Sequence, residues 1–307
     1  MYHNVMLSVV ISALSAAPPN ASACVGEFSV CPSTGACTLI DCSRCTAGEY
    51  RCPRSKDCVN GAAKYADCPG LDGTHLDWRL GDAARLDYLV AHTAREEQAA
   101  QLVNQAPAIA HLGIPAYNWL NDDVHALASG VGTVFPNGNT LGASWSAPLL
   151  GEVGGAIGHE ARAAHSGFTS AGNRGVGGGP WSGNGVGLHM YGPNVNLVRD
   201  PWWGRAQEVY SEDPALTSAL AASFVSGAQQ HAAPAAKGDA RLLAGACCKH
   251  LAAYDVEDDR FVFDAAVSTR DMFEFYLPQF RACAEAGVNS MMASYNSING
   301  VSSIARF

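Results

Sequence analysis

Apolar runs that end in polar residues alternate with helical patterns along the second half of the chain. Residues 242–248 form one such run, which is followed by Lys249 and His250, and residues 288–293 form another, which leads to Tyr295. The segment between the two runs has the apolar spacing of a helix. Unbroken apolar runs are typical of parallel strands covered on both faces. Strands that alternate with helices predict an α/β fold, here a (β/α)8 barrel of the TIM type.

The segment 191–214 predicts a third unit of this kind. The alternating apolar residues within 195–198 indicate a buried strand, and Pro201 ends it because proline cannot donate a ladder hydrogen bond. A loop rich in charged and aromatic residues follows. The acids and serine of residues 211–214 suit the start of a helix that reaches about Gln230.

Polar side chains at these predicted strand ends form the candidate site. Parallel strands of a barrel bring their carboxyl ends to one rim, where active sites lie. Carboxylates, Arg and Lys hydrogen-bond to sugar hydroxyls, and aromatic rings pack against the C–H faces of sugars. The sequence therefore predicts a sugar-binding site that needs no metal or organic cofactor, and its candidate residues are Asp122, Arg199, Lys249, His250 and Tyr295.

A cysteine-rich segment, residues 24–68, precedes the barrel. It has few large apolar side chains, so it needs covalent cross-links to fold. Zinc bound through Cys42 and Cys45 is the alternative to disulfides. The segment is either a spacer or a carbohydrate-attachment module. Its candidate disulfide cysteines are Cys24, Cys31, Cys37, Cys42, Cys45, Cys52, Cys58 and Cys68.

The amino-terminal residues 1–23 resemble a secretory signal peptide. They contain a short apolar run and end in an A-x-A cleavage pattern. A spanning helix needs about 20 apolar residues, so we expect a secreted protein without a membrane segment after cleavage. Residues 69–78 have the composition of a linker, and residues 79–307 form the barrel domain.

Composition excludes two other classes of function. The net charge of −9 and the lack of any Lys/Arg cluster argue against nucleic-acid binding. The glycine-rich residues 172–187 lack the endings of phosphate-binding loops, so we assign them no chemistry.

Long motifs in the barrel segment, over about residues 80–300, resemble glycoside hydrolase family 3, in its β-xylosidase and α-L-arabinofuranosidase branch. The motifs are YNWLNDDVHA (117–126), FPNGNTLGASW (135–145), NVNLVRDPWWGRAQEVYSEDP (194–214), GACCKHLAAYDVE (245–257), RFVFDAAVSTRD (260–271) and SYNSING (294–300). The resemblance implies that the five candidate site residues hold the sugar that is cleaved. It also implies a retaining double displacement by two carboxyl groups about 5–5.5 Å apart.

The resemblance places both catalytic carboxyl groups outside this chain. The family's nucleophile is an Asp in a glycine-aromatic-apolar-Ser-Asp context, and no such motif occurs in residues 1–307. The acid/base comes from a following α/β sandwich domain. We therefore expect the N-terminal part of a barrel, incomplete before its last strands, that is inactive alone.

Three functional hypotheses follow from this resemblance. The first is a secreted exo-acting xylan 1,4-β-xylosidase whose partner is a β-linked xylo-oligosaccharide. The second is a β-glucosidase of the same family, and the third is a non-catalytic carbohydrate-binding fragment. For the barrel cysteines, two interpretations stay open: buried free thiols, or a disulfide that joins Cys247 or Cys248 to Cys283.

Overall fold

The computed structural model describes residues 73–77, 80–127, 130, 132–170, 187–230 and 242–306, and the backbone of four short strands within residues 29–60. The predicted signal peptide, the side chains of the eight amino-terminal cysteines and residues 171–186 of the glycine-rich segment lie outside this description. Part of the predicted linker is included. There Thr74, His75 and Asp77 are buried, and the carbonyl oxygen of His75 accepts a hydrogen bond of 2.6 Å from Nε of Arg85.

Short elements dominate the first half of the described chain, and longer helices follow. The strands are β1 (Ser29–Val30), β2 (Cys37–Thr38), β3 (Glu49–Arg51), β4 (Cys58–Asn60), β5 (Gln105–Ala106), β6 (Tyr117–Asn118), β7 (His189–Met190), β8 (Gly245–Leu251), β9 (Asp264–Ala265), β10 (Ser290–Ala293), β11 (Ser297–Ile298) and β12 (Val301–Ser302). The α-helices are α1 (Asp82–His92), α2 (Arg95–Ala100), α3 (Gly138–Gly142), α4 (Ala147–Ser170), α5 (Pro214–Ala228), α6 (Thr269–Asp271), α7 (Pro278–Glu285) and α8 (Ser303–Arg306). Two 3₁₀ turns, η3 (Ala110–Leu112) and η4 (Ala206–Glu208), and a π-helical turn, η5 (Met272–Tyr276), complete the set.

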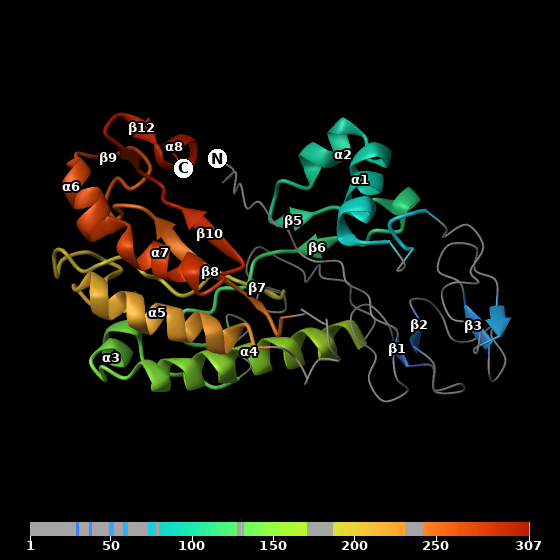
Figure 1. The fold of residues 1–307 in the computed structure, drawn as a ribbon, viewed down its shortest axis with the longest axis horizontal. Helices are drawn as coiled ribbons and strands as arrows, with labels where there is room; N and C mark the ends of the chain where they lie inside the picture. The colour runs from blue at the N-terminus through green and yellow to red at the C-terminus, as the bar shows by residue number, and fades with distance from the viewer. Residues whose placement is uncertain are drawn as a thin grey trace.

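A parallel sheet in the order β10-β8-β7 forms the centre of the fold. A parallel bridge from Asn121 to Met190 extends it by one further segment. Figure 1 shows α4, α5 and α7 together on one side of these strands, while α1, α2, β5 and β6 form a separate lobe. This arrangement of a parallel sheet and covering helices agrees with part of a (β/α) barrel.

Several predicted element boundaries differ from the structure. Residues 195–198 are not a regular strand: only Asn194 forms a bridge, with Lys249, and the Asn196 side chain bonds the backbone of His250 instead. The strand predicted over 242–248 begins later and continues through Lys249 and His250 to Leu251, because both its neighbours pair with it that far. The predicted helix over 79–105 is interrupted between α1 and α2 at Thr93–Ala94, where the backbone is extended.

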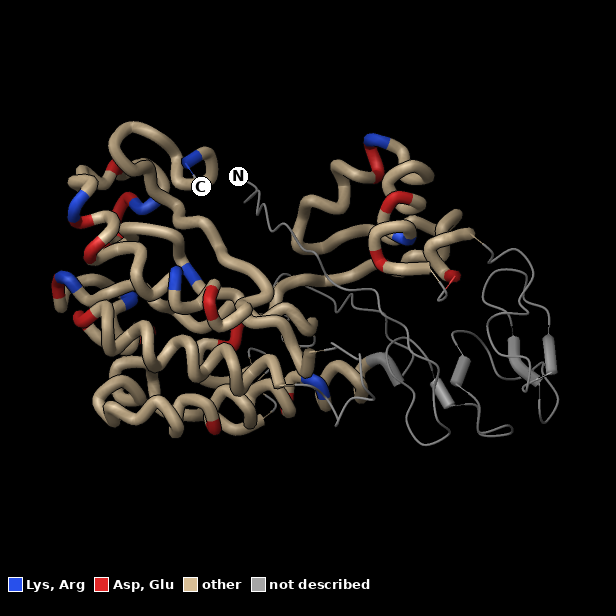
Figure 2. The backbone as a smooth tube through the Cα atoms, in the orientation of Figure 1, with Lys and Arg blue, Asp and Glu red and all other residues tan. Residues whose placement is uncertain are grey.

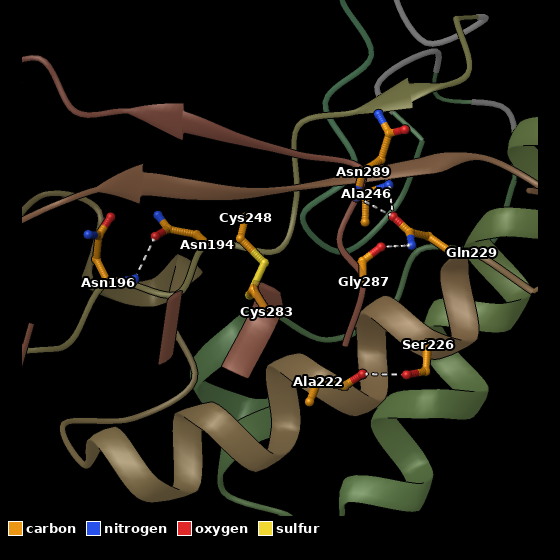
Figure 3. Close-up of a disulfide and its surroundings, with 10 residues drawn as sticks. All are labelled: Asn194, Asn196, Ala222, Ser226, Gln229, Ala246, Cys248, Cys283, Gly287 and Asn289. Atoms are coloured by element: carbon orange, nitrogen blue, oxygen red, sulfur yellow. Dashed lines mark hydrogen bonds between the residues drawn. A yellow bond between two sulfur atoms is a disulfide. The ribbon is translucent and has the colours of Figure 1, made fainter. Parts of the chain in front are cut away.

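Helix α5 begins where the acidic residues predicted it. Asp213 is the N-cap, its carboxylate accepting a 2.6 Å hydrogen bond from the backbone N–H of Leu216, and Pro214 is the first helical residue. At the other end, the Gln229 side chain bonds the backbone of Gly287, Ala246 and Asn289, which ties α5 to β8 and to the start of β10 (Figure 3).

A disulfide joins Cys248 on β8 to Cys283 on α7 (Figure 3). Cys247 is a buried free thiol. Successive strand residues point to opposite faces, so Cys248 points toward the helical layer and Cys247 toward the other face of the sheet. The structure therefore selects Cys248 from the adjacent pair as the partner of Cys283.

Glycines allow α4 and α5 to lie unusually close together. A Cβ atom added at Gly227 would lie 2.0 Å from the carbonyl oxygen of Gly151, and one at Gly154 would lie 2.4 Å from that of Phe224. No helix among the described residues is both long and apolar enough to cross a membrane.

We expect Gly227→Ala to lower the free energy of unfolding by about 1–3 kcal/mol, because the two helices must separate to accept the methyl group. Urea unfolding followed by circular dichroism measures the change. Gly167→Ala is the matched control on α4, since a Cβ there meets nothing within 4 Å. Alanine at that position should stabilise the helix by up to about 1 kcal/mol. Equal effects of the two substitutions would contradict the close-packing account.

Candidate functional site

A buried lysine on the central strand anchors the candidate site. Lys249 is 2% exposed, and its ammonium lies 2.8 Å from Oδ1 of Asp122. Asp122 comes directly after the bridge residue Asn121, whose side chain donates to the carbonyl oxygen of Gly187. The Asp122 side chain is half exposed, so its second oxygen faces outward from the pair. The sheet thus presents a carboxylate that is already neutralised and still able to accept hydrogen bonds.

His250 lies beside Lys249 as a neutral imidazole. Its Nδ1 is 3.1 Å from Oδ1 of Asn196 and its Nε2 is 3.2 Å from a guanidinium nitrogen of Arg205. Arg can only donate, so Nε2 accepts and Nδ1 carries the proton. Burial, and then the charges of Lys249 and Arg205, hold the pKa of His250 well below its usual value. The ring therefore orients its neighbours without adding charge.

A buried ion pair between Arg205 and Glu208 forms the next wall of the site. Both lie on the η4 turn, and they make two parallel contacts, of 2.7 and 2.6 Å. Glu208 also accepts a hydrogen bond from Asn194. Burial alone would raise the pKa of Glu208, but the bonds and charge of Arg205 outweigh it and hold that pKa below its usual value. This bidentate pair is rigid and charge-balanced.

An aromatic cluster closes the site on the side of β10. The Tyr295 ring lies 5.4 Å from the His250 ring and 5.3 Å from the Tyr254 ring. The guanidinium of Arg260 lies over Tyr295, 4.4 Å from its centroid, and pairs with Glu257 at 2.8 Å. Glu257 in turn accepts a hydrogen bond from the hydroxyl of Tyr254. These contacts fix Tyr295 beside the buried histidine.

Four of the five predicted site residues lie in this network, and Arg199 lies apart from it. The exposed guanidinium of Arg199 packs over Phe275, 4.2 Å from the ring centroid, with Tyr276 at 5.9 Å. Arg205, six positions later in the same motif, contacts His250 instead. The sequence signal for this was the spacing of Arg205 and Glu208, which places an Arg and an acid on one turn.

Asp255 forms a second polar contact close to Arg199. Burial raises the pKa of Asp255 to about 6, although a hydrogen bond with Tyr276 and the charge of Arg199 oppose the shift. Its Oδ1 is buried without a hydrogen-bond partner in the described part of the chain. This carboxyl group therefore favours the protonated form in the folded state.

We expect Asp255→Asn to change how stability depends on pH. The folded-state pKa is above the model value of 3.8, so the stabilising effect of this group is complete below pH 3.8 and is lost as pH rises through about 6. The amide should remove that loss, so the variant should gain stability over the unmodified chain at pH 8 and not at pH 4. Urea unfolding at both pH values measures this, and an equal difference at both would contradict the assignment. Asp271→Asn, on the exposed start of α6, is a control.

The site combines donors and acceptors in charge-balanced pairs with an aromatic wall. Lys249 with Asp122 and Arg205 with Glu208 each sum to no net charge. Figure 2 shows charged residues of both signs gathered around the sheet, whereas the α5 tube carries none. Among the described residues, no group of three or more His, Cys, Asp or Glu side chains could hold a metal ion. Such a site suits a neutral ligand rich in hydroxyl groups.

Comparisons with known proteins agree with this chemistry. Residues 184–305 match the glycosyl hydrolase family 3 N terminal domain. A probable exo-1,4-β-xylosidase of Aspergillus terreus is 35% identical over 81% of this chain and 31% of its own length. A β-xylosidase/α-L-arabinofuranosidase of Medicago sativa subsp. varia is 38% identical over 72% of this chain and 28% of its own.

Solved structures give the same family. A family 3 exo-β-xylosidase in complex with a xylobiose aziridine activity-based probe has a TM-score of 0.62 at 29% identity, and covers 74% of this chain and 29% of its own. A β-glucosidase of Bifidobacterium adolescentis has a TM-score of 0.53 at 30% identity, and covers 69% of this chain and 28% of its own. The fold and site thus define a sugar-active α/β protein. The chain belongs to glycoside hydrolase family 3, and it spans about a third of the length of the curated relatives it matches.

Proposed function

We propose that this chain holds the terminal sugar of a β-linked xylo-oligosaccharide, as the sugar-binding part of a retaining exo-β-xylosidase. The observation that carries the proposal is the connected network of Asp122, Lys249, His250 and Arg205. Its charges are balanced internally, so it can bond to hydroxyl groups without requiring a charged ligand. The names of the relatives support xylose or arabinose as the sugar.

In this proposal each side chain orients the sugar ring. The outward oxygen of Asp122 accepts from a ring hydroxyl, while Lys249 donates to a neighbouring hydroxyl oxygen. His250 holds Arg205 in place through its acceptor nitrogen, and Tyr295 packs against the C–H face of the ring. A sugar that is fixed in this way reaches the transition state at a smaller entropic cost.

Hydrolysis itself is proposed to need two carboxyl groups that residues 1–307 do not supply. We expect no release of nitrophenol from 4-nitrophenyl β-xyloside by this chain alone. The same chain extended by residues encoded after Phe307 should hydrolyse it. Hydrolysis by residues 1–307 alone would contradict this division of labour. The proposed setting is extracellular, supported by the A-x-A pattern at the end of residues 1–23.

Binding calorimetry tests the substrate class. We expect the chain to bind xylose more tightly than glucose. The second candidate is a β-glucosidase, which the structural neighbour from Bifidobacterium adolescentis favours. Tighter binding of glucose than of xylose would select this second candidate.

A further inference from the structure

An open cavity adjoins the candidate site on the far side of Asp122. Its volume is about 380 Å³, within the range of roughly 300–1,000 Å³ typical of small-molecule sites. Three separate segments line it: residues 122–127, Asn137 and the pair Gln207–Glu208. Lys249, His250 and Tyr295 do not line it. The cavity therefore shares one edge with the site and extends beyond it.

Close backbone packing sets the wall of this cavity. A Cβ atom at Gly138 would lie 2.1 Å from the carbonyl oxygen of Glu208, so the turn at Asn137 lies directly against the η4 turn. Val124, Ala126 and Leu127 supply apolar surface on the remaining side. The cavity thus has an apolar side and a polar rim, the combination that binds sugar rings.

Three polar side chains on the cavity have hydrogen-bonding groups to spare. Nδ1 of His125 bonds the carbonyl oxygen of Phe135 at 2.7 Å, and this contact requires the proton to be on Nδ1. Nε2 of His125 is then an acceptor. Within the described residues, no hydrogen bond engages this nitrogen or the side-chain amides of Asn137 and Gln207. Together they offer two N–H₂ donor groups and three acceptors.

The charge on the cavity selects the chemistry of its occupant. Both carboxylates on its rim are already paired, Asp122 with Lys249 and Glu208 with Arg205. A cation would compete with those partners, and an anion would meet two carboxylates. A neutral polyol fits both the charge balance and the unpaired amides.

We propose that this cavity is a second sugar-binding subsite, which holds a further ring of the oligosaccharide whose terminal ring lies at the Lys249 network. His125, Asn137 and Gln207 bond its hydroxyl groups, and Asp122 lies between the two rings. The proposal rests on the proposed function, because the first ring must occupy the neighbouring site. It predicts that a disaccharide binds more tightly than a monosaccharide.

Calorimetric titration of the full chain with xylose and with xylobiose tests the subsite. For the unmodified chain we expect xylobiose to bind at least about tenfold more tightly than xylose, the effect of one or two additional hydrogen bonds. The double variant Asn137→Ala/Gln207→Ala should reduce this ratio to below about threefold and leave the affinity for xylose unchanged. Both side chains are exposed, so the variant should fold normally.

Asn139→Ala is the matched control, since Asn139 is exposed in the same turn and does not line the cavity. It should keep the full ratio. Equal affinity for the two sugars in the unmodified chain, with xylose still bound, would overturn the subsite and leave the proposed function intact. An equal loss of both affinities in the double variant would also overturn it. Failure of the unmodified chain to bind xylose would refute both proposals.

Discussion

Replacement of Lys249 by methionine should reduce xylose binding by about 10- to 150-fold. A hydrogen bond to a charged group contributes about 1.5–3 kcal/mol, and this variant removes the ammonium that both pairs with Asp122 and faces the sugar. Methionine keeps the length and apolar surface of the side chain, so the packing of β8 should persist. Binding calorimetry measures the loss, and circular dichroism confirms that the variant is folded.

The control for this variant removes an ion pair of the same length from the surface. Arg270 lies 2.8 Å from Glu274, and both side chains are mostly exposed. Arg270→Met should leave xylose affinity unchanged and change stability by less than about 1 kcal/mol. If Lys249→Met binds xylose as well as Arg270→Met does, the lysine is not part of the sugar site.

Removal of the disulfide between β8 and α7 should lower the free energy of unfolding by about 4 kcal/mol. The bridge joins Cys248 to Cys283, which are 35 residues apart, and a loop of that length loses about this much chain entropy in the unfolded state. The double variant Cys248→Ser/Cys283→Ser tests this in urea unfolding under non-reducing conditions.

The single variants at Cys248 and Cys283 provide the internal control. Each breaks the same bridge, so each should destabilise the chain about as much as the double variant does. Strong non-additivity of this kind is the signature of two residues that act as one unit. Additive effects of the two single variants would show that the sulfurs act separately.

The sequence predicted the parallel α/β core because the signals there are local and strong. The apolar run before Lys249 and the acidic start of α5 each correspond to a real element. The strand expected over residues 195–198 was wrong because alternating apolar residues report burial and not pairing. Val195 and Leu197 are indeed buried, but the side chain of Asn196 replaces the ladder bonds.

The candidate site was predictable in part, for a related reason. Asp122, Lys249, His250 and Tyr295 follow or end predicted strands, so topology alone brings them together. The choice between Arg199 and Arg205 depends on how the loop after residue 198 folds back. The η4 turn directs Arg205 to His250, whereas Arg199 packs on Phe275 from a distant segment. Contacts of that kind leave no pattern in one sequence.

The central claim, that the Lys249 network binds a sugar, is tested most directly by nuclear magnetic resonance. A ¹⁵N-labelled sample is titrated with xylose and the backbone amide shifts are followed. The account predicts saturable shifts at Lys249, His250 and Tyr295, none in α1 or α2, and loss of the shifts in Lys249→Met. Saturable shifts confined to other parts of the chain, or no shifts at saturating xylose, would contradict it.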